Sequence, residues 1–205
     1  MTEAGIGRVL VASLHQGIAD ILPSRLDFYE NWLHSEGLRH GTIGLAPLHA
    51  VLSFLRLEGE AYGAITRRAG EYAAEWTVAS QRPLVRSVIR HLPVGLRARA
   101  VLRLARATIH ATYAGSRAVL RVRRGAGTID VRGSLFCGIR DSSPQPLCGY
   151  YGALVLRLFE LYGVRAGVTP SECRAVGDRS CILGFVLDGR PDSVSEEAGE
   201  PRASA

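Results

Sequence analysis

The sequence predicts an α+β fold in which a helical N-terminal half packs on a small antiparallel sheet. Up to Gly115, apolar residues recur with the period of about 3.6 residues that is typical of helices. Beyond Gly115 the period falls to two, and the order becomes β-hairpin, apolar helix, β-hairpin. A doubly wound parallel sheet would need strands that alternate with helices, so the class is α+β.

The N-terminal half divides into helices at its proline and glycine residues. Pro23 ends the first helix because proline cannot continue one, Ser24 is a candidate cap for the second, and Pro93 separates the last two. The expected helices are 4–22, 24–35, 47–57, 60–79, 83–92 and 94–114. Small residues in the fourth helix would let another backbone approach closely; they are Gly63, Ala69, Gly70 and Ala73.

The C-terminal half contains two hairpins around one helix. Strands are expected at 119–123 and 128–137, and again at 164–176 and 179–187, with a turn at Gly177-Asp178 in the second hairpin. An apolar helix over 147–162 lies between them and ends at Gly163. Residues 1–189 are therefore expected to form one domain, and the acidic segment 190–205 a disordered tail.

Composition narrows the class of protein. Of the 205 residues 47% are hydrophobic and 21% charged, which suits one globular domain with its own core. The most apolar stretch, 150–161, is interrupted by Arg157 and Glu160, so no transmembrane segment is expected. The N-terminus lacks the features of an export signal, so we expect a cytoplasmic protein, in which cysteines serve as thiols or metal ligands.

Three of the four cysteines are placed to converge. Cys173 and Cys181 lie at equal distances in sequence from Gly177, so a symmetric hairpin would make them cross-strand neighbours. Cys148 stands at the start of a helix, where unpaired N–H groups favour a thiolate. A soft tetrahedral site would suit zinc, but it requires a fourth ligand. The alternative is that these cysteines are small buried hydrophobic residues.

The stretches Cys148-Gly-Tyr-Tyr-Gly-Ala and Glu172-Cys173-Arg-Ala-Val-Gly177-Asp178-Arg-Ser-Cys181 resemble the C-terminal signature of the vinyl-reductase-type (4-vinyl reductase) domain family. That family includes a protein linked to bacteriochlorophyll biosynthesis, phenol-sensor domains of transcription activators and, more distantly, subunits of the transport protein particle. The resemblance is strongest over 134–187. It implies a domain, often a homodimer, whose helices and sheet enclose a pocket for a hydrophobic or aromatic small molecule.

The resemblance also implies a ligand set for zinc. In the phenol-sensing members, cysteines at the positions of Cys148, Cys173 and Cys181 hold the metal, together with a glutamate three residues before the second cysteine. Here that position is Pro170, and Glu172 stands next to Cys173 instead. Either a β-bulge re-aims Glu172 toward the metal, or Cys137 supplies the fourth ligand.

Four further residues are candidates for contact with a bound ligand. They lie on long helices that should meet the sheet, and each combines an apolar body with a polar group. They are Tyr72, Trp76, His110 and Tyr113. The alternative is that they are ordinary core residues.

The region 82–124 is rich in arginine, and no Asp or Glu occurs between Trp76 and Ile129. This region could face an anionic partner, such as a lipid headgroup, a nucleic acid or an acidic protein surface, or it could be a solvated face. Aromatic residues are not interleaved with the arginines as in a base-stacking platform, and no nucleic-acid motif is present.

No complete catalytic motif is present, so enzymatic activity is left open. The leading hypothesis is binding of a hydrophobic or aromatic small molecule by a sensor, carrier or accessory domain. A second is participation in tetrapyrrole (bacteriochlorophyll) vinyl-group reduction, which would depend on a separate reductant because nicotinamide and flavin fingerprints are missing. A third is a dimeric scaffold or interaction protein.

Overall fold

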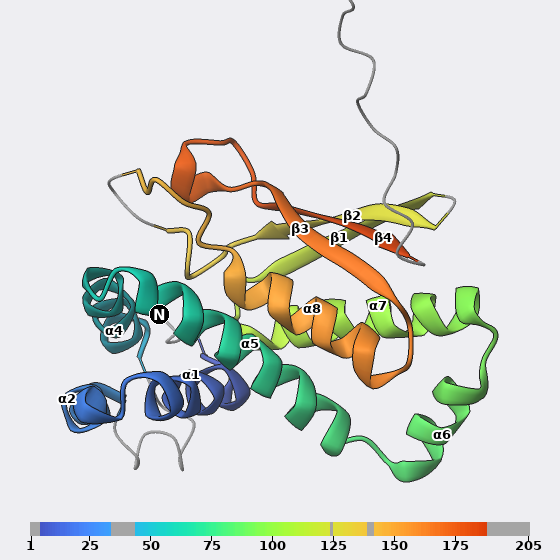
Figure 1. The fold of residues 1–205 in the computed structure, drawn as a ribbon, viewed down its shortest axis with the longest axis horizontal. Coiled ribbons are helices and arrows are strands. Elements are labelled where there is room, and N and C mark those ends of the chain that lie inside the picture. The colour runs from blue at the N-terminus through green and yellow to red at the C-terminus, as the bar shows by residue number, and fades with distance from the viewer. Residues whose placement is uncertain (1–4, 34–43, 124, 139–141, 188–205) are drawn as a thin grey trace, which may run out of the picture.

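The fold is described by a computed structural model, which covers residues 5–33, 44–123, 125–138 and 142–187. It confirms the α+β class, with helices packed on a four-stranded antiparallel sheet (Figure 1). The helices are α1 (Arg8–Ile21), α2 (Leu26–Leu33), α4 (Leu45–Leu57), α5 (Glu60–Ala79), α6 (Pro83–His91), α7 (Val94–Thr112) and α8 (Gly149–Leu161). The strands are β1 (Arg117–Arg123), β2 (Ala126–Arg132), β3 (Ala166–Glu172) and β4 (Ile182–Leu187).

The two predicted hairpins join into one sheet of order β1-β2-β4-β3. The central pair is β2 with β4, in which Ile129 lies opposite Leu183. The register between β3 and β4 shifts between Pro170 and Glu172, so β3 contains the irregularity that the sequence analysis considered.

α8 occupies the centre of the molecule. In Figure 1 it lies between α5 and the sheet, with α7 beside it under the same sheet face and α1 on the far side of α5. Its apolar residues are buried around most of its circumference, which explains why its sequence is hydrophobic without a clear polar stripe. The fully buried members are Tyr150, Tyr151, Leu154, Val155, Leu158 and Phe159.

Small residues allow α5 to approach its neighbours closely. A Cβ atom added at Gly70 would overlap with the carbonyl oxygen of Tyr150 and lie 3.1 Å from the Cβ of Ala153. On the other side of α5, a Cβ at Gly17 of α1 would lie 2.8 Å from the carbonyl oxygen of Ile65. The predicted close approach is therefore confirmed at Gly70, whereas Gly63 faces open space.

Three strands, β2, β3 and β4, are shorter than predicted. β2 ends at Arg132 because Gly133 adopts a left-handed φ of 67°, and a Cβ there would overlap with the carbonyl oxygen of Gly115. The second hairpin is not symmetric about Gly177, because a short 3-10 helix (Arg174–Val176) replaces the predicted end of β3, and β4 begins only at Ile182. Cys173 and Cys181 therefore lie in the connection rather than in paired strands.

Two of the predicted segments include residues that the structure does not describe. The tail 190–205 and the end of the second predicted helix, 34–35, lie outside the described residues. Within the described segments, we find no helix with both the length and the hydropathy that a membrane crossing needs.

Two alanine substitutions in α5 test the close approach to α8. We expect Gly70→Ala to lower the free energy of unfolding by about 1–3 kcal/mol, because the added methyl group must push the two helices apart. Gly63→Ala is the matched control and should raise it by about 0.5–1 kcal/mol, since alanine restricts the unfolded chain and meets no neighbour. Urea unfolding measures both changes, and equal effects at the two positions would refute the packing argument.

Candidate functional site

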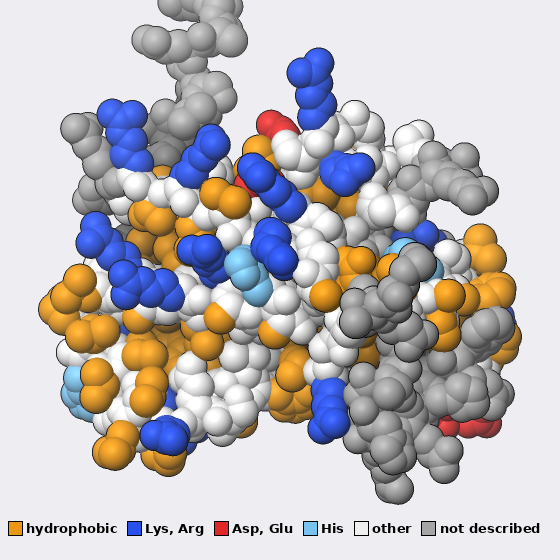
Figure 2. Space-filling model, turned by 180° about the vertical axis from the view of Figure 1, so that it is seen from behind, with side chains coloured by type: hydrophobic (Ala, Val, Ile, Leu, Met, Phe, Trp, Pro, Cys, Tyr) orange, Lys and Arg blue, Asp and Glu red, His pale blue; other side chains and the backbone are white. Residues whose placement is uncertain are grey.

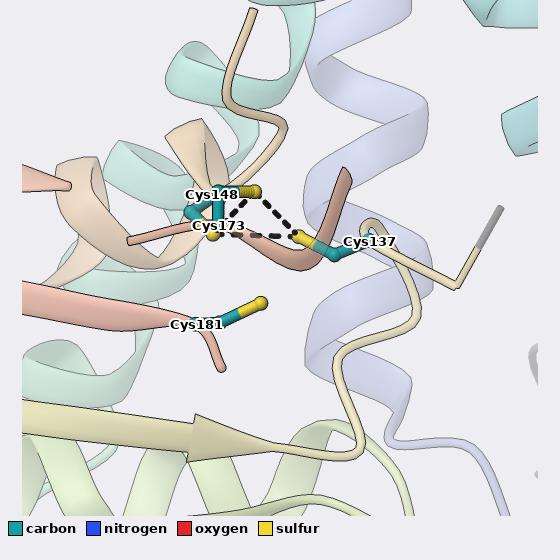
Figure 3. Close-up of side chains that lie close together, drawn as sticks. All are labelled: Cys137, Cys148, Cys173 and Cys181. Atoms are coloured by element: carbon teal, nitrogen blue, oxygen red, sulfur yellow. Dashed lines mark hydrogen bonds between the residues drawn. The ribbon is translucent and has the colours of Figure 1, made fainter. Parts of the chain in front are cut away.

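The four cysteine sulfurs converge at one end of the sheet (Figure 3). Cys137 lies in the loop after β2, and Cys148 is the N-cap residue of α8. Cys173 and Cys181 lie in the connection between β3 and β4. All four are buried and free. Three separate segments of the chain thus point four side chains at a common centre.

The sulfur separations suit one metal ion. The Sγ atoms of Cys137 and Cys148, and those of Cys148 and Cys173, are 3.3 Å apart, and those of Cys137 and Cys173 are 3.5 Å apart. All four lie within 4.8 Å of one another. A disulfide would require about 2.05 Å. Tetrahedral coordination with metal–sulfur bonds of about 2.3 Å places the sulfurs about 3.8 Å apart, so shifts of about 1 Å or less would complete the site.

Backbone hydrogen bonds hold the connection between β3 and β4 in shape. The N–H of Cys173 donates to the carboxylate of Asp178 at 2.8 Å, and the N–H of Asp178 donates to the carbonyl oxygen of Cys173 at 3.3 Å. The N–H of Arg174 donates to the sulfur of Cys181 at 3.5 Å. Because hydrogen bonds to a metal-bound sulfur orient it and offset its charge, these contacts suit a ligand loop.

Arg56 brings a positive charge toward the loop that carries Cys137. Its guanidinium donates to the carbonyl oxygen of Phe136, the residue before Cys137, at 3.3 Å. Four thiolates around a divalent ion leave a net negative charge, so a nearby guanidinium would stabilise the occupied site.

The protonation of the metal-free cluster differs from the expectation for Cys148. Hydrogen bonds from the thiols of Cys137 and Cys148 hold the pKa of Cys181 well below its usual value. Hydrogen bonds to Cys137 and Cys181, together with burial, raise the pKa of Cys148. The start of α8 therefore does not by itself lower the pKa of Cys148. Binding of a metal would release the remaining protons.

The structure groups Cys137, rather than Glu172, with the three predicted cysteines. The Glu172 carboxylate instead accepts a hydrogen bond from the hydroxyl of Ser180. The sequence signal for Cys137 was Gly133, because its left-handed backbone turns the chain out of β2 and into the loop that carries this sulfur.

A groove of about 590 Å³ lies between α5, α8 and β3. Its lining is partly apolar and partly charged, so it differs from the enclosed apolar pocket that the sequence analysis predicted. The lining residues are Arg67, Arg68, Glu71, Gln145, Pro146, Gly149, Gly152, Ala153, Leu156, Arg157, Glu160, Val168 and Pro170.

Most of the charge in the groove is already paired. Arg68 donates to Glu71 at 2.8 Å, and Arg157 donates to Glu160 at 3.0 Å. Arg67 is exposed and forms no ion pair with the described residues. The groove therefore offers one unpaired cation beside an apolar floor.

The groove and the cysteine cluster are built from the same segments. Pro146 lies two residues before Cys148, and Gly149 follows it directly. On the opposite wall, Pro170 lies three residues before Cys173. An ion that holds the sulfurs together would therefore also fix two walls of the groove.

The predicted ligand residues of α5 are Tyr72, which forms a polar contact with α1, and Trp76, which packs against Tyr72. The rings of Tyr72 and Trp76 stack with centroids 5.5 Å apart. The Tyr72 hydroxyl donates to the Asp20 carboxylate at 2.6 Å and accepts from Arg68 at 2.9 Å. Neither aromatic residue lines the groove.

The other two predicted ligand residues connect α7 to its surroundings. The Nε2 atom of His110 accepts a hydrogen bond from the N–H of Ala118 at 2.9 Å, which ties α7 to β1. Tyr113 is partly buried and packs on the core. Ligand contact at His110 and Tyr113, as at Tyr72 and Trp76, stays a prediction.

Substitutions of single ligands test which side chains bind the metal. We expect the wild-type chain to bind one Zn²⁺ tightly, and Cys137→Ser to weaken this binding by at least about tenfold because the tetrahedron loses a thiolate. Glu172→Gln is the control and should leave the affinity unchanged. Competition with a coloured chelator measures all three. Loss of binding in Glu172→Gln with retention in Cys137→Ser would reverse the assignment.

The comparisons with known proteins bear on the fold. No known family profile matches the sequence, and a search of curated proteins finds no match. The 4-vinyl reductase assignment therefore stays a prediction.

Solved structures with a similar fold include an H-NOX protein from S. oneidensis in its Fe(II)NO ligation state. It has a TM-score of 0.55 at 10% identity, over 89% of this chain and 99% of that chain. The NMR structure of an H-NOX domain from Shewanella oneidensis in its Fe(II)CO state has a TM-score of 0.52 at 10% identity, over 90% and 99% of the two chains. At this identity the likeness shows a shared fold alone.

The phenol-responsive sensory domain of the transcription activator PoxR, solved with phenol, has a TM-score of 0.49 at 17% identity, over 72% of this chain and 77% of that chain. This value is too low to establish a common fold. The comparisons thus place this chain among proteins of one α+β architecture.

Proposed function

We propose that this chain is a small-molecule-binding domain of the sensor or carrier type, in which a zinc ion held by the four cysteines fixes the walls of the ligand groove. One observation carries the proposal: the loop before α8 and the end of β3 supply both groove-lining residues and sulfur ligands. The shared fold is compatible with it, because the H-NOX structures of this architecture hold NO or CO on their iron.

The chemistry of the four ligands favours zinc in a structural role. Thiolates are soft ligands, and a tetrahedral set of four suits Zn²⁺. Four sulfurs that lie within 4.8 Å of one another would surround a single ion and would leave no coordination position open for water or substrate. The ion would therefore shape the domain rather than take part in a reaction.

The groove favours a ligand with an apolar body and one anionic or strongly polar group. Its volume lies within the range of about 300–1,000 Å³ that is typical of small-molecule sites. Leu156 and Val168 offer apolar contact, and the unpaired guanidinium of Arg67 offers a partner for a carboxylate or phenolate. Gly152 leaves the floor open, since a Cβ added there would meet nothing within 4 Å. Aromatic carboxylates and phenols are thus the first ligands to test.

A variant that fills the groove tests the site. We expect a panel of aromatic carboxylates and phenols to contain compounds that raise the melting temperature, since a ligand at 100 times its Kd stabilises the folded state by about 2.7 kcal/mol. Gly152→Leu should weaken the best compound at least about tenfold, because its side chain occupies the groove floor.

Gly63→Leu, on the exposed side of α5, is the matched control and should bind the compound normally. Equal binding by wild type and Gly152→Leu would place the ligand elsewhere, for example in the interior beside Phe136 and Tyr150. A panel without any hit would contradict the proposed function.

Removal of the metal tests its role in the groove. If the ion fixes the two walls, the metal-free protein should bind the same compound at least about tenfold more weakly, and added Zn²⁺ should restore the affinity. Isothermal titration before and after chelation measures the change. Unchanged affinity in a folded metal-free protein would separate the metal from ligand binding.

A further inference from the structure

An amphipathic helix at one corner of the molecule leaves its apolar side uncovered. No residue of α6 is buried, and its apolar side chains reach into solvent together with two from the start of α7. We call this set the α6–α7 patch; its members and their exposed fractions are Leu84 (80%), Val85 (46%), Val88 (63%), Val94 (45%) and Leu96 (51%).

The helical spacing explains why α6 is held only along one edge. At about 100° per residue, Leu84, Val85, Val88 and Ile89 share one side of the helix. Of these four, Ile89 is partly buried against the core, whereas the other three are exposed. In Figure 1, α6 projects at the corner between the end of α5 and the start of α7. The helix thus presents most of its apolar side outward.

Arginine side chains lie beside this patch. On α7, Arg99 and Arg103 follow Leu96 at helical spacing, so the three lie on one side of the helix. Figure 2 shows hydrophobic side chains gathered at the lower left, over α6 and the start of α7, with basic side chains above them. None of the arginines described between residues 82 and 123 forms an ion pair with a described acidic residue. The surface therefore combines exposed apolar groups with uncompensated positive charge.

We propose that the α6–α7 patch docks on the surface of an anionic lipid bilayer. Helices that lie in a membrane interface combine an apolar side, which enters the headgroup boundary, with arginine or lysine, which binds anionic headgroups. Leu84 and Val88 would enter the boundary, while Arg99 and Arg103 would contact lipid headgroups. With so few apolar residues, docking would be reversible and would weaken as salt screens the charges.

The arginines beside the patch argue against a second copy of the chain as its partner, and the exposed apolar residues argue against a nucleic acid. In a symmetric pair of copies, the same patch meets itself, so the two sets of arginines would face each other and repel. A nucleic acid would bind the arginines through its phosphates, but it would leave Leu84 and Val88 without an apolar partner. An anionic bilayer satisfies both features of the surface.

Flotation of the full chain with lipid vesicles tests the proposal. We expect about tenfold more binding to phosphatidylcholine vesicles that contain phosphatidylserine than to phosphatidylcholine alone, and a marked decrease at high salt. The double variant Leu84→Glu with Val88→Glu should lose at least about tenfold of the binding. The double variant Arg99→Ala with Arg103→Ala should lose about tenfold on anionic vesicles.

Leu57→Glu is the matched control. Leu57 is 82% exposed on α4, at the opposite end of the molecule from α6 in Figure 1, and its substitution should leave vesicle binding unchanged. Absence of binding to anionic vesicles, or equal binding by the Leu84 and Val88 variant, would overturn the proposal. Association of the wild type into dimers that this variant abolishes, without vesicle binding, would assign the patch to a second copy instead.

Discussion

The backbones of α5 and α8 approach so closely at Gly70 that one methyl group would overlap with the carbonyl oxygen of Tyr150. This contact fixes the first turns of α8 against the longest helix of the described structure. Those turns follow Cys148, which caps α8, and they include Gly149 and Gly152 of the groove floor. The position of one sulfur and the depth of the groove therefore both depend on the absence of a side chain at residue 70.

A metal ion on the cysteine cluster would stabilise the end of the sheet, where strand pairing has stopped. β2 ends at Arg132 and β3 at Glu172, so the segments that carry Cys137 and Cys173 lie beyond the ladder hydrogen bonds. Few interactions other than local turns and packing hold such loops. A single ion bound to four sulfurs would cross-link them, which restricts the loops and the groove walls attached to them at the same time.

Sequence periodicity predicts the order of the helices and of the two hairpins, because both depend on local spacing, but not where the strands end. The spacing of Cys148, Cys173 and Cys181 predicts that they could converge, and the structure brings them together, although not through the symmetric hairpin expected. Cys137 was only an alternative, because the end of β2 depends on a tertiary contact between Gly133 and Gly115. The hydrogen-bond partner of an aromatic side chain is equally non-local, since the Tyr72 hydroxyl donates to Asp20 on another helix. The groove joins three elements distant in sequence, so no local pattern could reveal it.

A metal centre of four sulfurs is the central claim, and X-ray absorption at the zinc edge tests it most directly. The measurement uses the full chain, purified without added metal or chelator. The account predicts about one zinc per chain with four sulfur neighbours at about 2.3 Å. Zinc coordinated by a mixture of sulfur and oxygen atoms would return Glu172 to the ligand set in place of Cys137. A folded chain without bound metal that also takes up none on addition of Zn²⁺ would contradict the claim.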